Sequence, residues 1–130
     1  MAGTFSTALN NKLLDHILKT AALDVPANIY VALYSVAPTA AGAGTELSGD
    51  NYARVVQNSW DAGASGASEN TGAITFAAAS GDWDEAVAFG IFDAITDGNF
   101  LAWGDLTVAK TVLSGDSCEF AIGELDVTNT

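Results

Sequence analysis

The feature that most constrains the fold is a series of short β-type segments that begins after Pro26 and continues to the end of the chain. Each segment is rich in Val, Ile, Phe, Tyr or Trp and is bounded by Gly, Asp, Asn or Ser, which is typical of strands separated by turns. Because no helical pattern interrupts them, we expect a mainly β fold, an eight-stranded antiparallel jelly-roll-like sandwich. The expected strands span residues 28–35, 52–60, 72–77, 85–93, 99–107, 109–113, 116–121 and 123–128.

The segment 4–22 has a different pattern and predicts one amphipathic helix ahead of the sandwich. Its start can be capped by Thr4 or Ser6, and Pro26 follows its end. Such a helix can pack over an open end of its own sandwich or dock on a partner, and both alternatives stay open. Its apolar residues recur every four positions and are candidate partner-binding residues: Phe5, Leu9, Leu13 and Ile17.

Two expected loops, 36–51 and 61–71, are long for a chain of 130 residues. The first is rich in Ala, Gly, Thr and Ser and has little apolar bulk to anchor it. We therefore expect it to gain order against another chain, with Thr39, Thr45 and Glu46 as further candidate partner-binding residues. Shorter turns carry stronger local signals, since Asp97 and Gly98 between two apolar runs predict a type I′ hairpin.

Length and composition favour a single domain, residues 1–130, with the helix at 4–22 and the sandwich at 28–128. The chain is 49% hydrophobic and 15% charged, which is enough apolar content for a core. Sixteen acids against four bases give a formal net charge of −12. This balance argues against nucleic-acid binding and against attraction to anionic membranes. The sequence also lacks a secretory signal pattern and an apolar run long enough for a membrane span.

The residues that could carry chemistry are few and scattered. The acids Asp82, Asp84 and Glu85 are most simply a solvated turn, with a loop calcium site as the alternative. His16 has no candidate nucleophile near it in the pattern, and the single Cys118 is expected to be a buried strand residue. We therefore expect no enzymatic activity, no catalytic residue, no cofactor, no metal site and no small-molecule substrate.

Arg54 is the only arginine in a chain with 16 acids. Its planar guanidinium suits bidentate pairing with a carboxylate, so we expect a structural ion pair at Arg54. The three tryptophans, Trp60, Trp83 and Trp103, lie in or beside expected strands. Core or interface positions are therefore the first expectation for them, and an exposed sugar-stacking platform is the second.

The chain resembles a family of small structural proteins of tailed bacteriophages. The resemblance rests on "IYVALYSVAPTAAGAGTELSGDNYARV" (29–55), on "ENTGAITF" (69–76), on "FGIFDA" (89–94), on the "GN" hairpin at 98–99 and on the closing "GD" and "F…G.L" at 115–125. The N-terminal helix matches as well, so the resemblance covers nearly the whole chain. It implies a non-enzymatic part of the phage particle, made in the host cytoplasm and present as a homotrimer.

The resemblance leaves more than one position in the particle open. The first expectation is a capsid cement or decoration protein on the outer capsid surface, bound to the major capsid protein and stabilising contacts between its subunits. The alternative is a tail or tail-fibre component, bound to tail proteins and able to bind the host. A host-binding role would require Trp60 and Trp83 to be exposed and grouped, and a soluble carbohydrate-binding or lytic module is the third class.

Overall fold

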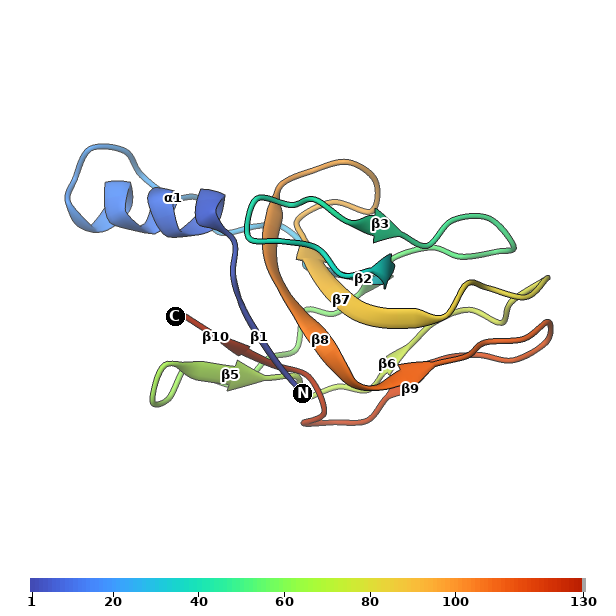
Figure 1. The fold of residues 1–130 in the computed structure, drawn as a ribbon. Helices are drawn as coiled ribbons and strands as arrows, with labels where there is room; N and C mark the ends of the chain where they lie inside the picture. Colours follow the sequence, from blue (N-terminus) through green and yellow to red (C-terminus); the bar gives the residue numbers. More distant parts are fainter. Residues whose placement is uncertain (130) are drawn as a thin grey trace.

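The structure of the protein is a computed structural model in which residues 1–129 are described (Figure 1). It is mainly β, sandwich-like, with one N-terminal helix, so the predicted fold class is confirmed. The elements are β1 (Ala2–Phe5), α1 (Thr7–Ile17), β2 (Tyr30–Val36), β3 (Thr45–Glu46), β4 (Val55–Val56), β5 (Ala67–Glu69), β6 (Ile74–Thr75), β7 (Ala86–Phe92), β8 (Phe100–Lys110), β9 (Glu119–Phe120) and β10 (Asp126–Thr128).

One large sheet has the order β3-β2-β7-β8-β1-β10-β5, and β4 also pairs with β2. Its neighbouring strands are antiparallel except for β1 and β10, which run parallel with Ala2 opposite Asp126. The expectation of a purely antiparallel sheet misses this pair, because β1 lies in a segment that the sequence pattern predicts to be helical. A second sheet of two strands, β6 and β9, covers part of one face of the large sheet.

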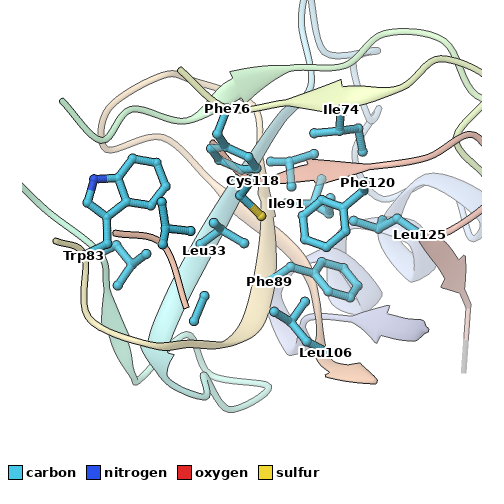
Figure 2. Packing of buried hydrophobic residues seen from close by; sticks show 14 of the residues in the cluster. Leu33, Ile74, Phe76, Trp83, Phe89, Ile91, Leu106, Cys118, Phe120 and Leu125 are labelled. Carbon is cyan, nitrogen blue, oxygen red and sulfur yellow. The ribbon is translucent and has the colours of Figure 1, made fainter. Parts of the chain in front are cut away.

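The main core lies between these two layers (Figure 2). Leu33 and Phe89 from the large sheet meet Phe76 and Phe120 from the β6 and β9 side, and all four side chains are at most 1% exposed. The Phe76 and Phe120 rings pack edge to face, with centroids 6.4 Å apart. Buried aromatic and aliphatic side chains of this size supply most of the stabilisation of a domain this small.

The other face of the large sheet carries a smaller apolar cluster. It is built on the alternate residues of β2 and β7, Tyr34 and Phe92, together with Phe100 at the start of β8. The segment between β2 and β3 folds back over this cluster, where Gly42 lies against the Phe100 ring. The same strands therefore bury both faces, and their apolar residues run continuously along the sequence.

The helix is shorter than the sequence predicts, and its first expected turn is a strand. Residues 2–5 pair with β8 and β10 as β1, so Phe5 lies in an extended segment. Ser6 then caps α1, because its hydroxyl accepts from the Leu9 N–H, and it also donates to the Phe100 carbonyl. The helix ends well before Pro26, because Lys19 has a left-handed backbone (φ 65°) and the Thr20 N–H bonds back to the Asp15 carbonyl.

Most expected strands overlap strands of the structure, with two kinds of difference. The expected strands 99–107 and 109–113 are one strand, β8, up to Lys110. The expected loops 36–51 and 61–71 contain the short strands β3 and β5. Asp97 and Gly98 both have positive φ, as a type I′ turn requires, although the whole connection between β7 and β8 is longer than two residues.

Candidate functional site

The most unusual feature of the molecule is α1, which projects beyond the sheet at one end (Figure 1). No residue of the helix is buried. Leu14 is 59% exposed, Ile17 71% and the following Leu18 69%. We call these three residues the apolar stripe. Helical side chains of this size normally pack against a core, so the stripe is a surface without a partner in the described part of the chain.

A groove of about 740 Å³ lies beside α1. β1 contributes Phe5, α1 contributes Leu9, and the segment 21–26 that follows α1 forms a second wall. The sheet side is largely apolar and aromatic and includes Trp60, Leu101 and Val127. Since these residues come from five separate segments of the chain, the groove is a product of the fold.

The groove also has a charged part, formed by Lys12 of α1 and Asp93 at the end of β7. Partial burial opposes ionisation of Asp93, but the hydrogen bonds from Asn99 and the charge of Lys12 outweigh it and lower the pKa of this carboxyl. The carboxylate accepts from the Asn99 backbone N–H at 2.6 Å and from its side-chain amide at 2.7 Å. Asp93 is therefore ionised at neutral pH and already committed to Asn99.

The groove and the apolar stripe lie on different sides of α1. Leu9 and Lys12 line the groove, whereas Leu14, Ile17 and Leu18 are not among its lining residues. At about 100° per residue, Leu14 and Leu18 point roughly opposite to Leu9 and Lys12. The helix therefore presents Leu9, Lys12 and Asp15 to the groove and an apolar surface away from the molecule.

The candidate partner-binding residues fall into three environments. Phe5 and Leu9 line the groove, Leu13 is half-buried and Ile17 is exposed. Thr39 is exposed in the segment after β2, and Thr45 is exposed in β3. Glu46 is occupied within the chain by Arg54, so it is not a free contact for another protein.

The segment 36–51 is anchored within the protein, and the expectation that it gains order against another chain stays a prediction. The Ala40 carbonyl accepts from the Thr7 N–H at the start of α1, and the Leu47 side chain is only 5% exposed. Gly44 has φ 131° and would bring a Cβ within 2.8 Å of the Val36 carbonyl. The small residues of this segment permit a close backbone path that sequence composition alone presents as floppy.

Arg54 forms a bidentate ion pair with Glu46. Its Nε lies 2.7 Å from Oε1 and its Nη2 lies 2.9 Å from Oε2. The Nη1 atom donates to the carbonyl oxygens of Ala94 and Asp97, and the guanidinium lies 3.6 Å above the Phe92 ring. The Arg54 side chain, from the residue directly before β4, thus links β3 to the β7–β8 connection.

Replacing Arg54 with Lys is expected to lower the free energy of unfolding by about 2 kcal/mol, because an ammonium group cannot make the paired bonds to Glu46 and also reach both carbonyls. Chemical denaturation measures the change. The exposed cation Lys19, replaced with Arg, is the control and should be neutral. An Arg54→Lys protein as stable as the wild type would show that a positive charge at this position is sufficient for the stabilisation.

Two tyrosines surround this ion pair. The Tyr52 hydroxyl accepts from the Leu33 N–H and donates to Glu46 Oε1 at 3.2 Å. Burial raises the pKa of Tyr52, and burial together with the Glu46 charge raises the pKa of Tyr34 to about 12. Both phenols are therefore neutral over the physiological range.

The raised tyrosine pKa values predict a loss of stability at alkaline pH. Below pH 10, Tyr34 is protonated in both the folded and unfolded states, and no stability is lost through it. Between pH 10 and about 12 the unfolded chain releases the proton first, so the free energy of unfolding falls. Chemical denaturation at several pH values across this range should show a smaller decline in the free energy of unfolding for Tyr34→Phe than for the wild type. An unchanged decline would remove Tyr34 as its source.

The other residues that the sequence singles out have structural positions. Trp83 is 6% exposed and donates to the Asp50 carbonyl, whereas Trp60 is half-buried at the groove. Exposure and grouping of Trp60 with Trp83 is therefore not observed. Cys118 is 3% exposed, and burial raises the pKa of its thiol. His16 accepts from the Leu23 N–H through Nδ1 and so holds the segment after α1.

Among residues 1–129, no group of three or more His, Cys, Asp or Glu side chains has metal-binding geometry. Asp82 accepts from the Ser114 N–H, and Glu85 accepts from the Thr111 hydroxyl, so these two acids serve turns. No helix within the described chain is long and apolar enough to cross a membrane.

Sequence reasoning misses the sheet side of the groove, because Leu101 and Val127 look like ordinary strand residues. It also misses Asn70, a fully buried side chain that holds three backbone groups. Asn70 lies four residues before the start of β6, and no local pattern marks it. For the groove we find no local signal, since its walls are distant in sequence.

The family of the chain places this fold among bacteriophage structural proteins. Residues 4–128 match the model of a family described as "Podophage GP4 fiber I protein gp80". Because the match covers almost the entire chain, the protein belongs to this family. No curated protein matches the sequence.

Proposed function

We propose that this protein is a non-enzymatic component of a phage tail fibre and that it assembles through the α1 end. The observation that carries the proposal is the unburied helix, which exposes Leu14, Ile17 and Leu18 beside an apolar groove. A partner surface explains this exposure, because contiguous large apolar side chains in water usually mark an interaction site. The fibre description of the family favours this location over the capsid shell.

The remainder of the molecule suits a structural body. The two apolar clusters bury both faces of β2 and β7, and the Arg54–Glu46 pair ties loops from three parts of the chain. A body of this kind keeps the α1 end in a fixed position relative to the rest of the subunit. A fibre part needs this rigidity, and it needs no reactive centre.

A second candidate is a cement or decoration protein on the outer capsid surface, bound to the major capsid protein. It is favoured by the net charge of −12 on a small domain, which keeps copies soluble and apart until they meet the shell. The α1 end would again be the contact. A host-glycan platform built from Trp60 and Trp83 is not proposed, because Trp83 is buried.

A cryo-electron microscopy map of the intact particle tests the proposal. Density for the sheet and α1 within the tail fibres supports it, particularly if α1 faces a neighbouring subunit. Density on the outer shell of the head overturns the fibre assignment and supports the decoration role. Absence of the protein from purified particles, checked by mass spectrometry, overturns both.

A further inference from the structure

The apolar stripe is not covered by any of the residues 1–129 that the structure describes. Leu14, Ile17 and Leu18 face away from the groove, and the nearby Val25 of the return segment is itself 92% exposed. α1 is held at its first turn, where Ser6 bonds to Phe100 and Thr7 bonds to Ala40. The helix therefore keeps its stripe on the outside while its base is fixed.

The groove is the matching half of this surface. It is largely apolar, it opens beside the same helix, and its volume of about 740 Å³ is large enough for several large side chains. A stripe and a groove on opposite sides of one helix cannot meet within one molecule. They can meet between two molecules, because the stripe of one copy is then free to enter the groove of the next.

The charge distribution points to the same occupant. Lys12 and Lys19 against Asp15 give residues 1–23 a net charge of +1, which leaves −13 for the rest of the total of −12. Most surfaces of two copies therefore repel each other. The α1 end of one copy is the exception, since it meets a groove whose lining in the other copy carries Asp15, Asp24 and Asp93 against Lys12.

We propose that a second copy of this chain occupies the groove, with the stripe of one copy seated against Leu9, Trp60 and Leu101 of its neighbour. This inference rests on the proposed structural function and identifies a second copy of the chain as the first partner. It is heterologous, since different surfaces of the two copies meet, and it joins copies in a closed ring if the rotation closes.

Self-association of the purified full-length chain tests the proposal by sedimentation over a range of concentrations. The wild type is expected to form an oligomer. The variant Leu14→Gln, Ile17→Gln, Leu18→Gln is expected to bind itself at least about a hundredfold more weakly, because three aliphatic side chains no longer bury apolar surface in the interface. Circular dichroism verifies that the variant remains folded, as the exposed positions predict. Replacing Val108 and Ile122 with Gln is the matched control, since both are exposed but outside the groove lining.

A mixing experiment separates this interface from simple stacking of one helix on another. Leu9→Arg blocks the groove but leaves the stripe, whereas the triple variant keeps the groove. Each alone should be monomeric, and an equimolar mixture should form a pair through one intact stripe and one intact groove. Failure of the mixture to pair would overturn the groove assignment.

A monomeric wild type, or an oligomer that the triple variant does not weaken, would overturn the proposal of a second copy. Neither result affects the position of the protein in the particle, which the density map decides. Failure of the interface and failure of the fibre assignment are thus separate outcomes.

Discussion

Replacing Gly104 with Ala should destabilise the protein by about 4 kcal/mol. A Cβ at this position would lie 2.6 Å from the Ala2 carbonyl oxygen, 2.7 Å from the Gly3 Cα and 2.8 Å from a ring carbon of Phe89. The first two obstacles are backbone atoms of β1, so they cannot rotate away. β1 must then separate from β8, at a cost at or above the upper end of ordinary overpacking.

Urea denaturation followed by circular dichroism measures this loss. Gly63→Ala is the control, because no atom lies within 4 Å of a Cβ built there, and it should change stability by less than about 0.5 kcal/mol. Since β1 leads directly into Ser6 and α1, Gly104→Ala should also disorder the helix base. Equal stability of the two variants would mean that β1 does not pack against β8 as observed.

The limits of the sequence pattern are clearest at this same strand. Phe5 lies four residues before Leu9, so a helical period includes it. The Ser6 N–H instead bonds to the Leu101 carbonyl, and β1 pairs with strands from the end of the chain. Local periodicity cannot detect such pairing, because the competing hydrogen-bond partners are about a hundred residues away. The N-cap at Ser6 could be predicted, since capping depends only on its immediate neighbours.

The candidate site shows the same division between local and distant information. The scarcity of cations predicts a carboxylate partner for Arg54, but it does not identify which of 16 acids provides it. The amphipathic helix is visible in the sequence, whereas its exposure is not, since that depends on where β8 and the segment 36–51 hold its base. The groove requires the fold itself, because Trp60, Leu101 and Val127 meet only after β5, β8 and β10 have assembled.

Replacing Asn70 with Ala should destabilise the protein by about 2–3 kcal/mol. The side-chain amide donates to the carbonyls of Gly72 and Ala121, and its oxygen accepts from the Leu125 N–H, all at 3.0 Å or less. Asn70 is 0% exposed, so the variant leaves the buried Leu125 N–H without a partner, which costs about 1–3 kcal/mol. The Gly72 and Ala121 carbonyls lose one of their donors but keep those from Gln57 and Glu124, so the connection from β5 to β6 loses part of its hold on the turn before β10. Asn11→Ala, at an exposed helix position, is the control and should be nearly neutral. If the two variants have the same denaturation midpoint, water replaces the hydrogen bonds that the Asn70 side chain makes.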